Sequence, residues 1–454
     1  MMRDPGRAGR WTLVLAAVGL ALAWSGPEVA IAATKPRAIM IVPFDASALD
    51  ADERWVGEGI EEILALGIAQ HPAFVQVDRA RMRGVGHVEV WGEPAVVQTA
   101  RTLHVDAAFF GRVERKGTDY VVQPRLVELK GGAGEPLPLD PFTVAPADLL
   151  PKLAALPVVY ARTLKVVLSE AEARKMEKAA LPTKSLKAFE LFARGAMAMS
   201  QKPGQEGNEQ AADLLARAIE IDPNFVVAHY TLGVVHQDLG NRWKAAAQFR
   251  ASIQLDPNYP ESHKALGDLF LAAPRRLFEQ AVEAYQKAIE LRPFYGEAWV
   301  GLGEAKAAKG DVDGAIGAYT KALAFNPINA RVHMSLGKIY YIEKGLYYES
   351  VTAYKKAIEL DPTAVDARMG LGEVYEDKGL YKEAMEEYQR VIDLDGKHSG
   401  ALYNLALVYE KVDPKEAIAQ WERYIALASQ LPSEKDWVDV ARQHLRKLKN
   451  QIKD

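Results

Sequence analysis

The sequence predicts an α/β N-terminal domain followed by an all-α solenoid of helical repeats. Two observations carry this prediction. Between residues 34 and 180, short apolar runs typical of buried strands alternate with segments of helical spacing. From Asn224 to Gly396 one pattern recurs, and the residues that close successive units are separated by 34, 36, 34, 35 and 34 positions. A period of this length indicates stacked units, each too small to bury its own apolar face.

The first residues have the organisation of a secretory signal peptide. Three arginines precede an apolar run of fourteen residues from Trp11 to Trp24, and Ala30-Ile31-Ala32 offers an A-x-A cleavage site. A retained membrane anchor is the alternative, but spanning a bilayer takes roughly 17–25 apolar residues and Glu28 interrupts the run. No cysteine follows, so a lipid-modified bacterial N-terminus is excluded. We therefore expect cleavage of residues 1–32 and export to the periplasm, with no stable transmembrane anchor afterwards.

Composition narrows the classes of function. The chain has 454 residues, of which 49% are hydrophobic, and a formal net charge of −4. A mildly acidic chain without a basic block gives no reason to expect nucleic-acid binding. It contains no cysteine, which excludes disulfides, thiolate metal sites and cysteine nucleophiles. Packing alone must therefore hold the fold together.

The segment 34–180 contains the elements of a small α/β layer domain. We expect strands where short apolar runs end at turn residues, and helices where apolar residues recur at helical spacing. The expected strands cover residues 37–44, 74–77, 106–113 and 120–129, and the expected helices cover residues 50–70, 94–103 and most of 146–178. Pro124 predicts an irregularity in the fourth strand or a place at a sheet edge.

Three short segments of this domain follow one another along the chain in the same order as in a known protein family. They are the strand end Val42-Pro43-Phe44, the helix start from Trp55 to Ile60, and the strand from Val105 to Val113. With them, residues 37–130 resemble the N-terminal domain of the TolB family. The resemblance implies the α/β fold and a place in the cell envelope. No β-propeller segment follows the domain, so the partners of TolB itself are not implied.

A domain boundary is expected at residues 181–185, and the repeats follow it. The unit that begins at Gly296 shows the recurring positions, which are Trp299, Leu302, Gly303, Ala315, Tyr319, Ala322 and Pro327. In this pattern, residues 185–431 resemble seven tetratricopeptide repeats, each a helix–turn–helix unit. The resemblance implies a concave groove lined by the first helix of each unit.

The repeat pattern also predicts local packing. Two antiparallel helices approach closely where one presents glycine and the other alanine, so Gly303 should meet Ala315. Glycines such as Gly310 are expected at positive φ in the turn between the two helices of a unit. A last helix within residues 433–454 should start at a capping box on Ser433 and give the solenoid a polar end.

The sequence contains no catalytic constellation, and we expect no enzyme activity, no cofactor and no metal site. The motifs HExxH, GxSxG and GxxxxGKS/T are absent. Ser335-Leu336-Gly337-Lys338 matches the SxxK of serine acyl enzymes, but its partner motifs are missing and it falls inside a repeat helix. His229, His263 and His333 share one repeat position, at least a full repeat apart, and are interpreted as packing residues rather than metal ligands.

The concave surface of the repeats is therefore the candidate site. Side chains one helical turn apart on the first helices should line it, and the residues nominated for partner binding are Tyr230, Lys264, Arg331, Met334, Lys338, Tyr341 and Met369. Arg331, Lys338 and Tyr341 give a basic and aromatic centre, which suits an extended peptide with a carboxylate or an aromatic anchor. A generic solvated groove is the alternative.

Two functions remain. The first is an exported scaffold that binds an envelope protein or an extended peptide through the repeat groove and the TolB-like domain. The second is a ligand-sensing or regulatory protein, whose α/β domain binds a small molecule and whose repeats relay the bound state. The sequence identifies neither the partner nor the oligomeric state.

Overall fold

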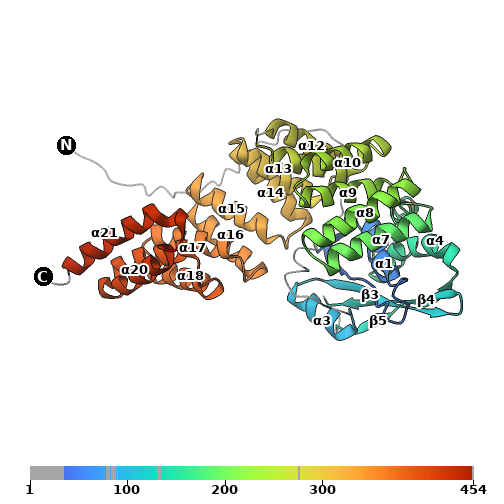
Figure 1. Cartoon of the computed structure of the whole chain (residues 1–454), viewed down its shortest axis with the longest axis horizontal. Helices are drawn as coiled ribbons and strands as arrows, with labels where there is room; N and C mark the ends of the chain where they lie inside the picture. Colours follow the sequence, from blue (N-terminus) through green and yellow to red (C-terminus); the bar gives the residue numbers. More distant parts are fainter. Residues whose placement is uncertain are drawn as a thin grey trace, which may run out of the picture. The chain divides into compact units, whose positions relative to one another are not determined.

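The computed structural model describes residues 35–77, 82, 88, 90–129, 134–274 and 277–451. The expected signal peptide, residues 1–32, lies outside the described residues. The described chain begins with a six-stranded sheet and its helices and continues into a series of paired helices (Figure 1). The predicted fold class, an α/β domain followed by an all-α solenoid, is confirmed.

The sheet combines a parallel half with an antiparallel half. Its strands are β1 (Arg37–Ile41), β2 (Phe74–Gln76), β3 (Ala107–Lys116), β4 (Asp119–Glu128), β5 (Pro136–Pro138) and β6 (Phe142–Val144). The order is β2-β1-β3-β4-β5, with β1 parallel to β2 and β3, while β4 pairs antiparallel with β3, β5 and β6. Pro124 lies where the outer partner of β4 changes from β6 to β5, so no ladder bond on that side needs its missing N–H.

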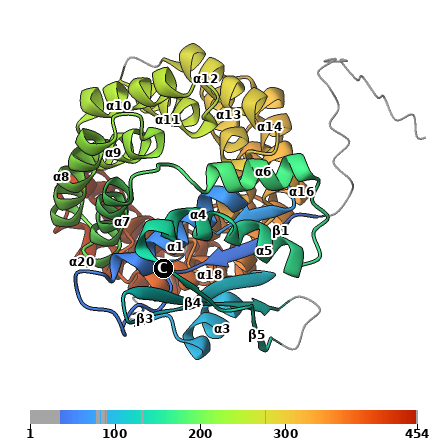
Figure 2. The ribbon, with the colours of Figure 1, turned by 90° about the vertical axis from the view of Figure 1, so that its right-hand side faces the viewer.

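Apolar layers cover both faces of the sheet because β1 alternates its side chains. Ile39 and Ile41 join the core with α1 (Trp55–Ile68), α4 (Leu149–Ala154) and α5 (Leu156–Thr163). Met40 belongs to a second core, with Val96 of α3 (Glu93–Thr102). Figure 2 shows α3 on the opposite side of the strands from α1 and α4. A parallel strand buried on both faces reads as a continuous apolar run, which is how β1 appears in the sequence.

In the described residues, the solenoid consists of seven antiparallel helix pairs and a final helix. After α6 (Glu170–Ala179), the pairs are α7 (Leu186–Gln201) with α8 (Gln205–Ile221), α9 (Val226–Asp238) with α10 (Arg242–Leu255), α11 (Pro260–Leu271) with α12 (Phe278–Leu291), α13 (Gly296–Ala308) with α14 (Val312–Phe325), α15 (Ala330–Ile342) with α16 (Tyr347–Leu360), α17 (Val365–Asp377) with α18 (Tyr381–Leu394), and α19 (Ser399–Val412) with α20 (Pro414–Ala428). The final helix is α21 (Lys435–Gln451). Among the described residues, no helix has both the length and the apolar character needed to cross a membrane.

The glycines inside the first helices pack against an aromatic ring of the second helix. The three atoms nearest to a Cβ atom added to Gly303 all belong to Tyr319 of α14, with Cε1 at 2.6 Å and Cδ1 at 2.7 Å, and the contact with Ala315 stays a prediction. Gly267, one unit earlier, faces Tyr285 of α12 in the same way. The glycine is required because an aromatic ring of the second helix fills the space into which a side chain would project.

The turn glycines have the conformation that the sequence predicts. φ is 83° at Gly310, 63° at Gly345 and 71° at Gly379, which is the left-handed region where a Cβ atom is strained. In the same turn, the side chain of Asp311 accepts a hydrogen bond of 2.9 Å from the backbone N–H of Gly314 and caps α14.

Successive units are joined by a side chain that reaches back to the closing proline. Nε1 of Trp299 donates a hydrogen bond of 2.8 Å to the carbonyl oxygen of Pro293. At the same repeat position, Nε2 of His263 lies 3.0 Å from the carbonyl oxygen of Pro257. Histidine at this position therefore helps to connect successive repeat units through its contact with the closing proline. No group of three or more potential metal-ligating side chains occurs in the described part of the chain.

The α/β domain and the first helix pairs share one apolar core. Trp55 of α1 packs edge-on against Phe189 of α7, with ring centroids 6.3 Å apart. Gly59 allows this approach, because a Cβ atom there would lie 2.9 Å from the Phe189 ring. The same core continues through Phe225 to Leu232 of α9.

The C-terminal helix begins later than the sequence predicts. A 3₁₀ turn covers Pro432–Glu434, and α21 starts at Lys435 rather than at a capping box on Ser433. Glu434 is held elsewhere, since it accepts hydrogen bonds from the Ser399 hydroxyl at 2.9 Å and the Tyr424 hydroxyl at 3.0 Å. These hydrogen bonds connect the 3₁₀ turn before α21 to α19 and α20.

Candidate binding face

The first helices of successive units, α9, α11, α13, α15, α17 and α19, form a face that we call the first-helix face. Neighbouring first helices contact one another, and an ion pair of 2.7 Å between Arg331 and Glu304 joins α15 to α13. All seven nominated residues lie on these helices, and four of them occupy one repeat position: Tyr230, Lys264, Met334 and Met369.

Lys264 is already paired with carboxylates of the chain. Its ammonium lies 2.9 Å from Asp268 on the same helix and 3.6 Å from Glu297 on α13. Burial opposes the charge, yet Glu297 and Asp268 together hold the pKa of Lys264 above its ordinary value. Asp268 also accepts a hydrogen bond of 2.7 Å from the Tyr285 hydroxyl. This cation and its carboxylates compensate each other.

Tyr230 belongs to the packing between α9 and its neighbours. Its ring lies 6.0 Å from Phe249 and 5.6 Å from Tyr259, measured between centroids. Burial raises the pKa of its hydroxyl. The side chain is half-buried and packs against the core formed by Ala245, Phe249 and Leu269.

The expected basic centre on α15 is largely neutralised. Arg331 is paired with Glu304, although the arginine side chain is 67% exposed. The Tyr341 hydroxyl donates a hydrogen bond of 2.7 Å to Asp377 of α17. Lys338 is exposed and makes no ion pair within 4.0 Å among the described residues. Only Lys338 is thus an available cation on this helix.

Carboxylates dominate the neighbouring part of α17. Burial raises the pKa of Glu373, and the nearby carboxylates Glu376 and Asp377 raise it further, while Lys338 acts in the opposite direction. Burial also raises the pKa of Glu376, against a hydrogen bond of 3.0 Å that it accepts from the Tyr388 hydroxyl. The face is therefore acidic where α17 crosses it.

Two aromatic residues extend the row of Met334 and Met369, and the sequence-based nomination missed them. Tyr403 of α19 follows Met369 by 34 residues, and Trp437 of α21 follows Tyr403 by 34 more. Their ring centroids are 5.5 Å apart. Trp437 is 55% exposed, whereas Tyr403 is half-buried. The repeat period would have found both residues if it had been continued beyond the sixth unit and into the final helix.

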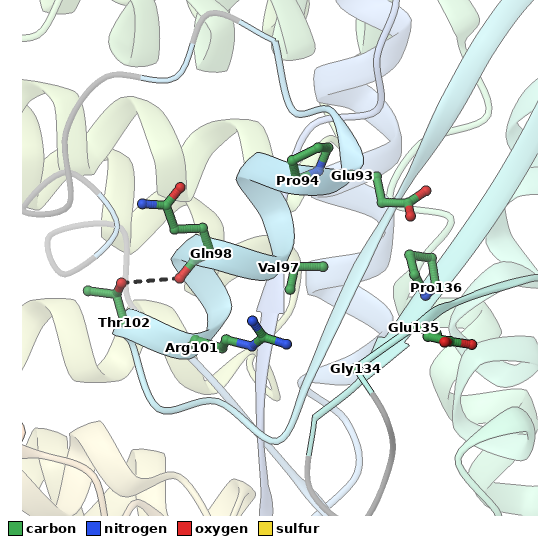
Figure 3. Close-up of a pocket in the computed structure, with 9 residues that line it drawn as sticks. All are labelled: Glu93, Pro94, Val97, Gln98, Arg101, Thr102, Gly134, Glu135 and Pro136. Carbon is green, nitrogen blue, oxygen red and sulfur yellow. Dashed lines mark hydrogen bonds between the residues drawn. The ribbon is translucent and has the colours of Figure 1, made fainter.

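A separate cleft lies on the α/β domain beside α3, with a volume of about 490 Å³. One wall is the exposed side of α3, including Val97, Gln98 and Arg101, and the other is the segment from Gly134 to Pro136 (Figure 3). The Arg101 guanidinium approaches Gly134, where an added Cβ atom would lie 3.2 Å from Nη2. The cleft is open to solvent and lacks a buried polar group at its base among the described residues.

The helix pairs match known repeat families. A family described as TPR repeat matches residues 341–379, and families described as Tetratricopeptide repeat match residues 226–259, 265–330 and 365–398. The chain therefore carries tetratricopeptide repeats, a class of unit that generally serves as a protein-interaction scaffold. No curated protein matches the sequence.

Solved structures with similar helix pairs include three proteins of low sequence identity. MamA is 27% identical over 37% of this chain and 95% of its own, with a TM-score of 0.33. YrrB, described as a TPR protein with an unusual peptide-binding site, is 19% identical over 42% of this chain and 97% of its own, with a TM-score of 0.35. PilF of Pseudomonas aeruginosa is 16% identical over 51% of this chain and 98% of its own, with a TM-score of 0.43.

Proposed function

We propose that this protein is an exported scaffold, without enzyme activity, that binds an envelope protein or an extended peptide through the first-helix face. One observation carries the proposal: a single repeat position leaves Met334, Met369 and Tyr403 partly accessible and Trp437 exposed along α15, α17, α19 and α21. A row of accessible apolar side chains on successive helices supplies the contact that an extended segment needs. The general role of tetratricopeptide repeats supports the same function.

Export rests on the signal-peptide pattern of residues 1–32 and on the resemblance of the α/β domain to the TolB N-terminal family. Cell fractionation is expected to recover the protein in the periplasm without residues 1–32. A full-length cytoplasmic pool would contradict export. In the scaffold, the α/β domain offers a second surface for partners, joined to the repeats through the core that α1 and α7 share.

Photo-cross-linking in cells tests the binding face. A photoreactive residue in place of Lys338 or Met369 is expected to give discrete protein adducts, because both positions lie on the first-helix face. The matched control is Lys321, an exposed lysine on the second helix α14. If both first-helix positions give no adduct, or the same adducts as Lys321, the scaffold function is wrong.

The cleft beside α3 favours the second function, in which the α/β domain binds a small molecule. Its volume of about 490 Å³ lies within the range of roughly 300–1,000 Å³ found for ligand sites. Arg101 offers a cation for an anionic ligand. If the α/β domain has this second function, mass spectrometry of the purified protein should detect a bound anionic compound, and the Arg101→Gln variant should lack it. Purified protein that carries no small molecule argues for the scaffold.

A further inference from the structure

Three first helices carry a carboxylate at one repeat position, and only two of these carboxylates have a cation of their own. The residues are Asp268, Glu304 and Glu373. Asp268 lies 2.9 Å from the ammonium of Lys264, and Glu304 lies 2.7 Å from the guanidinium of Arg331. Glu373 makes no ion pair within 4.0 Å among the residues that the structure describes. The carboxylate at this repeat position is therefore paired with a cation on α11 and on α13, but not on α17.

The surroundings of Glu373 are acidic. It shares its end of α17 with Glu376 and Asp377, and the cation that acts on it is Lys338 of α15. Glu376 and Asp377 each accept a hydrogen bond from a tyrosine hydroxyl, and Lys411 also acts on Glu376. Although Glu373 is exposed overall, partial burial of its carboxylate and then the two acidic neighbours raise its pKa above the ordinary value. A second cation arriving from solvent would relieve this repulsion.

An apolar row runs beside Glu373 toward the C-terminal end. Met369 lies one helical turn before Glu373 on α17, and its Cε atom is 3.9 Å from the Cβ position of Gly400 on α19. Tyr403, one turn further along α19, stands against Trp437 of α21 with 5.5 Å between ring centroids. Trp437 leaves 55% of its surface exposed to solvent.

We propose that the first-helix face from α15 to α19, together with the adjoining Trp437 of α21, takes an extended segment of a partner protein in which a lysine or arginine neighbours apolar side chains. The apolar side chains cover Met369, Tyr403 and Trp437, and the basic side chain lies on Glu373. The carboxylate anchor expected from the sequence fits this surface less well, because Arg331 already has its carboxylate and α17 is acidic. The inference rests on the proposed scaffold function and names the chemistry of its partner.

Fluorescence anisotropy with synthetic peptides and the full chain tests the chemistry directly. The probe is a labelled, N-acetylated peptide that alternates leucine with lysine, and its counterparts carry glutamate for lysine or serine for leucine. The leucine–lysine peptide is expected to bind tightest. Glu373→Gln should weaken it about threefold, as expected for a partly exposed ion pair, and Glu373→Lys about tenfold or more. Trp437→Ala should weaken binding about tenfold through the loss of an aromatic anchor.

Glu386→Lys on α18 is the matched control, since it makes the same change in net charge at an exposed position of the second helix. It is expected to leave binding within about twofold of the parent. Far-UV circular dichroism and the melting temperature check that each variant is folded, and Met369→Gln provides a second test of the row if Trp437→Ala unfolds α21. Equal binding of the lysine and glutamate peptides, or equal effects of Glu373→Lys and Glu386→Lys, would overturn the inference.

The partner in cells separates this inference from the function on which it rests. Cross-linked adducts from Met369 should disappear in the Glu373→Lys background and persist with Glu386→Lys. Adducts that persist in both backgrounds leave the scaffold function standing and reject the basic segment. No adducts from any first-helix position reject the scaffold function itself.

Discussion

Within one repeat unit, alanine in place of glycine is predicted to lower the free energy of unfolding at one position and to raise it at another. Gly303 in α13 and Gly317 in α14 both lie inside helices, where alanine is favoured over glycine by about 1 kcal/mol. A Cβ atom at Gly317 meets no atom within 4 Å, so Gly317→Ala should raise the free energy of unfolding by about 1 kcal/mol. At Gly303 the Cβ atom would lie 2.6 Å from the ring of Tyr319, which is 2% exposed. Overpacking costs about 1–3 kcal/mol, so Gly303→Ala should lower stability by a net amount of about 1 kcal/mol.

Urea unfolding, followed by far-UV circular dichroism, measures the change in the free energy of unfolding for both variants. Because a repeat contacts mainly its neighbours, amide hydrogen exchange of α13 and α14 shows whether the change is local. Tyr319→Leu removes part of the ring that the new methyl group meets, so Gly303→Ala should cost less in that background, as a double-mutant cycle measures. The reasoning fails if Gly303→Ala stabilises the protein as much as Gly317→Ala, or if its cost is the same with leucine at position 319.

Three other substitutions test contacts elsewhere in the chain. Arg292 is 5% exposed and lies 2.7 Å from Glu261, so Arg292→Met should lower stability in urea by about 3 kcal/mol, and adding Glu261→Leu should restore most of the loss. Hydrogen bonds from Arg115 and then from Tyr120 hold the pKa of Glu53 below its ordinary 4.5. Glu53→Gln should therefore lower the free energy of unfolding by about 1–2 kcal/mol at neutral pH. In thermal melts, the difference in stability between the parent and this variant should shrink as the pH falls below 4.5. Asp311 caps the second helix of its unit, whereas Leu346, at the same turn position of the next unit, makes no side-chain cap. Leu346→Asn should therefore raise the free energy of unfolding by about 1 kcal/mol, and Asp311→Ala should lower it by as much. If Leu346→Asn does not stabilise the protein, the geometry of the two turns differs.

Features that depend on a few neighbouring residues could be predicted from the sequence. The period of the repeats gives the helix pairs, and the turn glycines have positive φ because a Cβ atom strains that conformation. Two strands were missed, β5 and β6, because each is three residues long and too short to show alternation. The sequence did not predict that the Tyr319 ring lies against Gly303, since Ala315 and Tyr319 both follow at helical spacing and only the structure shows which side chain lies nearest.

The sequence by itself predicted the candidate face and a row of residues on it from Tyr230 to Met369, and continuing its period extends this row to Tyr403 and Trp437, which the nomination left out. Only the tertiary structure decided which charges on that face are available. Lys264 meets Glu297 and Arg331 meets Glu304 across neighbouring first helices, while Glu373 is left without a cation among the described residues. Such pairs join residues about one repeat apart, and a long side chain can reach either neighbouring helix. The balance of charge on a solenoid face is therefore set by how adjacent units are rotated and stacked, which the spacing of residues along the chain does not specify.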